Sequence, residues 1–372
     1  MTKAKELSEL ASAATVTSGN VALSGGLDVD GVTDLDVVDI DGAANFAADV
    51  TFANGADIIT ASAGTSNFRA GVNAGDAIAS GGNYNTVVGD EAGTAITTGD
   101  RNTAVGFEAL KTATTAQYNT AIGYQALEAN TGNNNTAVGD QALEANIGGA
   151  NNSALGDDAL VANTTGSTNT AMGASALASN TTASNNTAIG FQSLTANTEG
   201  YSNVAVGNQS MITNTTGLNN TATGRYALYA NTTGGSNVAV GLQALFANTT
   251  ASNNTAVGYQ SGAAVTTGVN NTLIGSLAGD AITTGFSNSL VGKFSGSALT
   301  DADYNVAMGQ QSLAQDTQGS ASVAIGSFAL GTQNFTSATD SHNTAVGYAA
   351  GSAITTGTQN TIIGGLAGVA LT

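Results

Sequence analysis

The sequence contains no cysteine, no proline and no tryptophan among its 372 residues, and only 9% of its residues are charged and 5% aromatic. Without cysteine the chain can form neither a disulfide nor a thiolate metal site. Enzyme cores rarely have so few charged and aromatic side chains. Small and hydrogen-bonding residues, with 49 glycines among them, dominate instead, which is typical of repeat architectures.

Basic residues are also scarce: seven Lys and Arg stand against 26 Asp and Glu, for a net charge of −19. Nucleic acid binding requires a basic patch, so this balance excludes nucleic acid as a partner. The acidity favours the solubility of a long particle.

The chain also lacks apolar stretches that would address it to a membrane. The first sixteen residues contain no apolar segment of the signal-peptide kind, and no run approaches the roughly 18 apolar residues of a membrane span. We therefore expect a protein made in a cytoplasm without an export signal of its own, and not inserted into a membrane.

What the sequence does contain is a short repeat, Asn-Thr-Ala-Val/Ile-Gly, which ends in glycine in all seventeen copies. Fourteen of the sixteen intervals between these glycines are as long as the interval from Gly89 to Gly106. The interval that ends at Gly139 is one position shorter, and the interval that ends at Gly347 is four positions longer. The repeat glycines are Gly89, Gly106, Gly123, Gly139, Gly156, Gly173, Gly190, Gly207, Gly224, Gly241, Gly258, Gly275, Gly292, Gly309, Gly326, Gly347 and Gly364.

A period of about 17 residues is too short for a pair of helices and suits one coil of a β-solenoid, which we expect to hold two short strands and two turns. Thr, Val or Ser lies three positions before each glycine, and Val, Ile, Leu or Met lies just before it in all copies but Thr223. This alternation is the period-2 signal of a strand. Seventeen coils at about 4.8 Å each would extend about 80 Å.

The alternation also predicts which side chains are buried. We expect the residue just before the glycine to face the coil interior, and the mostly Ala residue before that to pack against a neighbouring chain. The predicted core column comprises Val105, Ile122, Val138, Leu155, Ile189, Val206, Val240, Val257, Ile274, Ile325, Val346 and Ile363.

Two further positions carry information about the backbone and the packing. A glycine that is never replaced predicts a positive φ or a close backbone approach. Four positions after the repeat glycine, eleven copies carry Leu or Met and six carry a second glycine. In those six copies an apolar residue lies three positions after the second glycine, as Ile96 does after Gly93. The volume of the core side chains is thereby kept, although the side chain comes from a different position of the repeat. The linking segments are rich in Asn, Thr and Gly and are predicted to be turns, with stacked Asn able to form ladders.

The segment Asn-Thr-Ala-Ile-Gly-Tyr-Gln-Ala-Leu at residues 119–127 resembles the head repeat of trimeric autotransporter adhesins and repeats of marine bacteriophage tail-fibre proteins. The resemblance covers residues 83–372. It implies a left-handed parallel β-roll whose three copies pack side by side as a homotrimeric rod. The adhesin repeat is a few residues shorter, so the loops are longer here. The chain ends within its last repeat without a membrane anchor, which favours the phage interpretation.

The part of the chain before this repeat region has a different character. Residues 1–17 are expected to be an attachment helix or a disordered tail, with Leu7 and Leu10 on one face for contact with a virion protein. Residues 18–82 are expected to be an extended, Asp- and Gly-rich β stalk, because apolar and acidic residues alternate strictly around Leu27 and Leu35. Together with the shaft at residues 83–372, these make three regions.

Few residues of the sequence are candidates for a catalytic or metal-binding site. The acidic residues 28–41 do not match a calcium-binding loop, and a solvated strand face is the preferred interpretation. The adjacent acids Asp90–Glu91 and Asp157–Asp158 are not spaced as the carboxylate pair of a glycosidase. His342 is the single histidine and is expected in a loop. We therefore predict no enzyme activity, no cofactor and no metal.

Two features are candidate contact sites. Aromatic residues directly after the glycine either stack on sugars or, as we prefer, pack at the edge of the rod; they are Phe107, Tyr124, Phe191, Tyr259 and Tyr348. The four-residue insertion around residues 335–342 is the one irregular loop.

The preferred function is a structural fibre or appendage of a phage virion, which contacts the host surface, whether glycan or protein. The alternatives are the head of a bacterial surface adhesin and an ice-binding β-solenoid. The Thr column, predicted to face the core and replaced by Val at four positions, speaks against ice binding.

Overall fold

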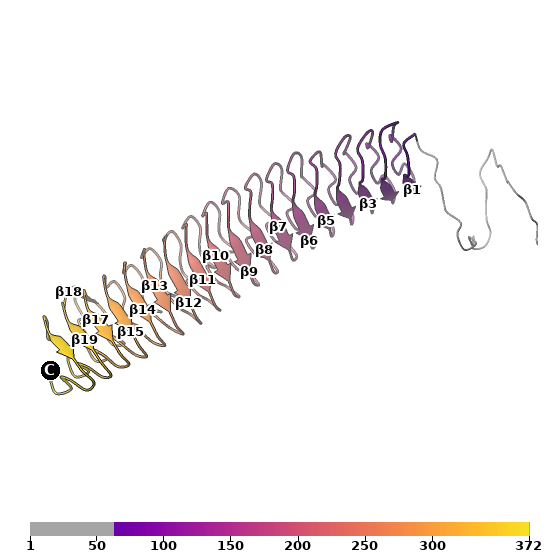
Figure 1. The fold of residues 1–372 in the computed structure, drawn as a ribbon. Helices are drawn as coiled ribbons and strands as arrows, with labels where there is room; N and C mark the ends of the chain where they lie inside the picture. Colours follow the sequence, from indigo (N-terminus) through magenta and orange to yellow (C-terminus); the bar gives the residue numbers. More distant parts are fainter. Residues whose placement is uncertain (1–62, 372) are drawn as a thin grey trace, which may run out of the picture. The chain divides into compact units, whose positions relative to one another are not determined.

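The structure is a computed structural model that describes residues 63–371, all within the second of two units, Ile58–Thr372. It is a β-solenoid in which one coil follows the next in a single row (Figure 1). The predicted attachment segment with Leu7 and Leu10, the acidic residues 28–41 and most of the predicted stalk lie outside the described residues.

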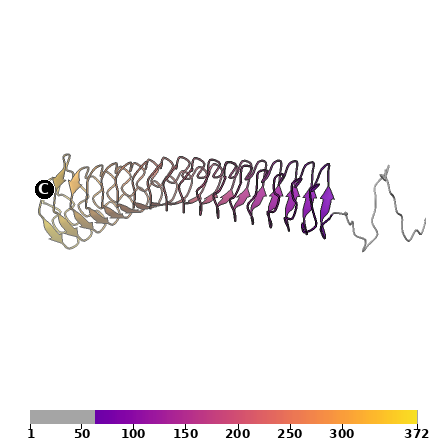
Figure 2. The ribbon, with the colours of Figure 1, turned by 90° about the horizontal axis from the view of Figure 1, so that it is seen from above.

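The solenoid carries an eighteen-stranded parallel sheet, with one three-residue strand per coil (Figures 1 and 2). Each strand pairs with the same repeat position of the next coil, as Thr103 does with Thr120. Its strands are β1 (Phe68–Ala70), β2 (Thr86–Val88), β3 (Thr103–Val105), β4 (Thr120–Ile122), β5 (Thr136–Val138), β6 (Ser153–Leu155), β7 (Thr170–Met172), β8 (Thr187–Ile189), β9 (Val204–Val206), β10 (Thr221–Thr223), β11 (Val238–Val240), β12 (Thr255–Val257), β13 (Thr272–Ile274), β14 (Ser289–Val291), β15 (Val306–Met308), β17 (Val323–Ile325), β19 (Thr344–Val346) and β20 (Thr361–Ile363). A separate two-stranded sheet joins β16 (Gly319–Ser320) to β18 (Thr339–Asp340).

The all-β parallel solenoid is confirmed, and no helix occurs among residues 63–371. Two details of the prediction are wrong. Apart from the two coils that contain β16 and β18, each coil has one strand instead of two. Residues two and four positions after the glycine adopt left-handed φ values near 55°, as Glu108 and Leu110 do, and these interrupt an extended chain. The solenoid also begins before residue 83: residues 67–84 form a further coil whose strand β1 pairs with β2.

Positions within a coil are numbered below from the repeat glycine, which is position 0, so that the strand occupies −3 to −1. The interior column is position −2, not −1. Ala104, Ala171 and Ala239 at −2 are fully buried, whereas the predicted core column at −1 points away from the coil and none of its members is buried. The misplaced residues are Val105, Ile122, Val138, Leu155, Ile189, Val206, Val240, Val257, Ile274, Ile325, Val346 and Ile363.

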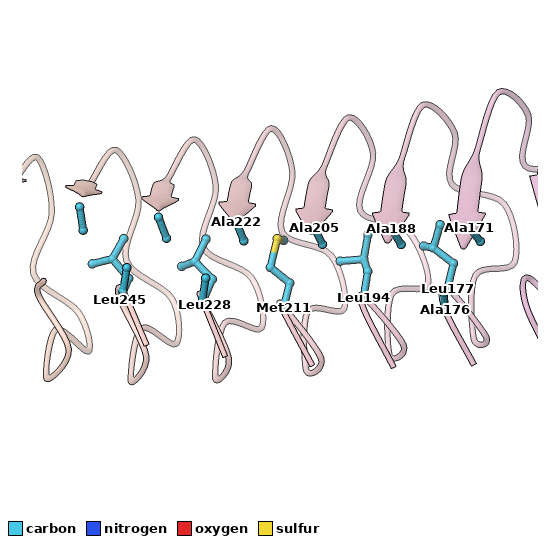
Figure 3. Packing of buried hydrophobic residues seen from close by; sticks show 14 of the residues in the cluster. Ala171, Ala176, Leu177, Ala188, Leu194, Ala205, Met211, Ala222, Leu228 and Leu245 are labelled. Carbon is cyan, nitrogen blue, oxygen red and sulfur yellow. The ribbon is translucent and has the colours of Figure 1, made fainter. Parts of the chain in front are cut away.

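Small side chains suit position −2 because the facing wall of the coil fills the interior. That wall contributes Leu or Met at position +4, as Leu194 and Met211 do, pointing toward the alanines of the strands (Figure 3). Both of these side chains are fully buried. In coils with Leu or Met at +4, the inner width therefore leaves room for only a methyl group on the strand side, and position −2 is Ala in all of them.

Where position +4 is glycine, other side chains fill the same space. Ile96, Val265 and Ile282 at position +7 are fully buried in such coils. A Cβ built on Gly93 would lie 2.7 Å from Val87 and 2.8 Å from Ile96, so both side chains occupy the volume that Leu fills elsewhere. The core thus keeps its packing density with two different sequences.

Two ladders of buried asparagine run through the interior. At position −4, the Asn102 backbone N–H donates to Asn85 Oδ1 at 2.9 Å, and Asn102 Nδ2 donates to the Ala116 carbonyl at 2.8 Å. At position +7, Asn163 Nδ2 donates to Asn146 Oδ1 at 2.7 Å. These amides pair backbone groups that the turns would otherwise leave unsatisfied inside the coil.

Candidate interaction surfaces

The first candidate surface is the strand face, formed by the outward positions −3 and −1 of the eighteen-stranded sheet. Position −1 exposes apolar side chains coil after coil, with Ile122 39%, Leu155 47% and Met308 44% exposed. Position −3 is mostly Thr and is also outward, so the expectation that the Thr column faces the core is wrong. From β2 to β20 neither column contains a charged residue.

A second face is formed by positions +2 and +5, and its first coils are acidic. Lys111 bridges Glu91 at 2.8 Å and Glu108. The hydrogen bond from Lys111, followed by one from Gln125, holds the pKa of Glu108 below its ordinary value. Further along, burial and then neighbouring carboxylates raise the pKa values of Glu144 and Asp158.

From the coil of Gly224 onward, the same face turns aromatic. Tyr229 stacks on Phe246, with centroids 5.1 Å apart and ring planes at 11°. Tyr226 meets Tyr229 edge to face at 5.4 Å. Phe294 and Phe328 follow at position +2. This face is therefore acidic in its first coils and aromatic from the coil of Gly224 onward, where Asp280 at +5 is the one carboxylate among its described residues.

A groove of about 430 Å³ lies in this aromatic part, between Phe294 and Phe328. Gln311 occupies position +2 of the coil between them, and Ala314 and Gly331 at position +5 leave the space open. Ser297, Thr332 and Ser352 contribute hydroxyl groups to the lining. None of these residues is among the sites predicted from the sequence. The available signal was the replacement of Gln by Phe at +2 next to the smallest side chains at +5.

The insertion between Gly326 and Gly347 is anchored by a buried carboxylate. Asp316 replaces Asn at position +7, and its Oδ1 accepts from the backbone N–H groups of Gly319 at 3.0 Å and Phe335 at 2.9 Å. Its Oδ2 accepts from Gln333 Nε2 at 2.6 Å. The ring of Phe335 is buried, so within the predicted contact loop the exposed residues are 336–338, Asp340 and His342.

The remaining predicted site residues are exposed or dispersed. The five aromatics directly after a repeat glycine are 41–58% exposed, and of these Phe107 and Tyr124 stack on each other at 5.7 Å. Glu91 forms an ion pair with Lys111. Asp158 lies beside Asp157 and Asp140 with no cation bridging them in an ion pair of the described residues. Whether the aromatics bind sugars or pack stays a prediction.

The part of the chain that the structure describes holds no cluster of three or more His, Cys, Asp or Glu side chains fit to bind a metal ion. Nor do residues 63–371 include a helix of the length and apolarity that a membrane crossing needs. No protein-family model matches the chain, and no curated protein matches it either.

Proposed function

We propose that this chain is a non-enzymatic structural rod, in which three copies pack side by side through their strand faces as a fibre or appendage of a phage virion. The observation that carries the proposal is the outward apolar column at position −1, which is repeated from β2 to β20 on every coil except that of Thr223. Monomeric soluble proteins rarely expose a continuous apolar surface of this extent, and such surfaces commonly mark interaction sites.

The charge distribution supports the same interface. The chain has a net charge of −19, yet the outward columns of β2 to β20 contain no charged side chain. Interface cores are depleted in charged residues in this way. A second copy of the same chain has the same outward columns, since its strands repeat with the same spacing.

The assignment to a virion rests on the resemblance of the repeat to marine phage tail fibres. In this proposal the rod sets the distance between the virion and the host surface, and its side faces are available for contact with the host. The adhesin head remains the alternative for the same trimeric rod, in which case the protein would be displayed on a bacterial cell.

Ice binding is a second candidate, favoured by the outward Thr column. Thr103 and Thr120 stand in register on neighbouring strands, so hydroxyl and methyl groups repeat on the strand face at the spacing of the strands, about 4.8 Å. Val replaces Thr at positions 204, 238, 306 and 323, which interrupts the array. The strand face would have to remain free of a second chain for this function.

The decisive experiment is the mass of the purified protein in solution, measured by light scattering. We expect about three times the chain mass of 36.2 kDa. A triple variant with Lys at Ile122, Leu155 and Ile189 introduces three charges into the strand face and is expected to dissociate into folded monomers, because buried unpaired charges are costly.

The matched control places Lys on the second face of the same three coils, at Glu128, Val161 and Thr195. Lys occurs naturally at this position as Lys111, and the control should stay trimeric. A monomeric parent protein would overturn the side-by-side assembly. Thermal hysteresis in the freezing of its solution would then favour ice binding.

A further inference from the structure

We propose that the groove between Phe294 and Phe328 binds a neutral linear oligosaccharide lying along the solenoid axis. The proposal deepens the surface-contact role proposed above, and it requires only that the second face stays outside the strand-face interface. The groove residues lie at positions +2, +5 and +6, whereas the strand face uses −3 and −1.

The spacing of the aromatic rings suits a sugar chain. Phe294 and Phe328 occupy the same repeat position two coils apart, which corresponds to about 10 Å along the stack. This is comparable with the length of a disaccharide in an extended chain. Gln311 lies at that position in the coil between them, so an amide alternates with two rings in step with the coils.

The chemistry of the lining indicates an uncharged ligand. None of the residues that line the groove is ionisable; apart from the two phenylalanines they carry amides, hydroxyls or small side chains. Amides and hydroxyls both donate and accept hydrogen bonds, as sugar hydroxyls require. Apolar surface with a few polar groups, at this volume of about 430 Å³, is typical of ligand sites.

Neighbouring side chains orient the rings of Phe294 and Phe328, and both rings keep surface that is accessible to solvent. Lys293 Nζ lies 5.0 Å from the Phe294 ring centroid, and Phe328 contacts the Tyr348 ring edge to face at 6.0 Å. Phe328 nevertheless remains 37% exposed. Orientation by these neighbours limits the rotamer freedom that binding would otherwise have to restrict.

Elsewhere on the second face, Ala178 and Ala263 are also small residues at +5, but no phenylalanine occupies +2 of their coils or of the coils next to them. The stacked rings of Tyr229 and Phe246 fill position +5 in two earlier coils, and carboxylates occupy the first coils. Only where Ala314 and Gly331 stand at +5 does the space between two phenylalanines open. The groove therefore depends on these substitutions within the repeat.

The test is saturation-transfer NMR on the full-length protein with cellohexaose and chitohexaose, and with an anionic galacturonate hexamer. We expect transfer to the ring protons of at least one neutral probe. The double variant F294Q/F328Q should bind that probe about tenfold more weakly, because two ring contacts are lost. Gln is the commonest residue at +2 in this chain, so the variant is expected to keep its fold.

Phe191→Ala is the matched control, since this ring is 49% exposed but lies outside the groove, and it should bind as the parent does. Transfer to neither neutral probe, preference for the anionic probe, or undiminished binding by the double variant would each overturn the proposal. A monomeric mass would reject the trimer and leave this result unaffected, so the two proposals fail separately.

Discussion

At the scale of single residues, the repeat glycine is required for two reasons. All seventeen have φ between 123° and 144°, a region that side chains with a Cβ avoid. In addition, a Cβ on Gly173 would lie 2.6 Å from the carbonyl oxygen of Gly190 in the next coil. The glycine therefore allows both the turn and the close stacking of neighbouring coils.

We expect Gly173→Ala to destabilise the solenoid by about 2–4 kcal/mol, because it combines backbone strain with a clash that has no flexible side chain to give way. The measurement is the midpoint of urea denaturation followed by circular dichroism. Gly148→Ala is the matched control, since nothing lies within 4 Å of its added Cβ, and its midpoint should not fall. Equal effects of the two substitutions would contradict this account.

The buried asparagines show a second residue-scale constraint. Each ladder amide pairs with the coils on both sides, so the end of a ladder leaves an atom unpaired. Asn248 Oδ1 is such an atom, because the next coil has Val265 at the same position. The unpaired oxygen thus marks the boundary between two types of coil.

At the scale of the single coil, two combinations of residues fill the core. Many coils have Leu at +4 and Asn at +7, whereas others have Gly at +4 and an apolar residue at +7. The two solutions place apolar volume from different points of the chain into the same space. Leu245 also has a positive φ of 50°, which glycine adopts more readily. Mixing the two solutions within one coil would leave a cavity or overfill the core.

We therefore expect Leu245→Gly and Asn248→Val to be coupled in a double-mutant cycle. Each alone should destabilise the protein, and the double variant should recover about 1–3 kcal/mol relative to the sum. The double variant moves the boundary by one coil, so Asn231 Oδ1 loses its bond from Asn248 Nδ2 while the unpaired Asn248 Oδ1 disappears. Additive free energies of unfolding from urea titrations would contradict the shared space.

At the scale of the whole solenoid, the ionisable groups make stability depend on pH. Burial, as the largest cause, raises the pKa values of Glu144, Asp158, Asp280 and Asp303. A carboxyl with a raised pKa binds its proton more tightly in the folded state, so stability falls as pH rises through that pKa. Glu108, whose pKa is lowered, acts in the opposite direction.

Among residues 63–371, four carboxyls have a raised pKa and one has a lowered pKa. We therefore expect the solenoid to lose stability as pH rises from about 4, the ordinary carboxyl pKa, toward neutrality. Thermal melting at a series of pH values checks this. Asp280→Ser should flatten the dependence, because Asp280 Oδ1 is buried without a partner and Ser occupies the same position at 297 and 352.

The exposed Glu199 provides the control substitution, Glu199→Ser, which should leave the slope unchanged. A melting temperature that rises steadily over this pH range would show that the favourable ion pairs of Lys111 outweigh the buried carboxyls.

The repeat itself determined much of the fold. The length of the coil, the strand at Thr-Ala-Val and the exchange of Leu143-type for Ile96-type core residues all follow from local sequence, because each coil makes the same contacts as its neighbours. The coil at residues 67–84 was not predicted, since Phe68-Arg69-Ala70 departs from the Thr-Ala-Val strand. Its pairing with β2 identifies it, and Asn67, Gly71 and Gly75 keep the repeat residues at −4, 0 and +4.

Only the tertiary structure decided which face of the strand is inside. Period-2 alternation shows that Ala104 and Val105 point in opposite directions, but it does not say which of them meets the opposite wall. That depends on the space left by Leu110 and Ala109, which reach the same interior from another part of the coil. The spacing of the repeat places Phe294 and Phe328 at one position two coils apart. Only the tertiary structure shows the groove between them, because whether that volume stays open depends on the side chains that surround it.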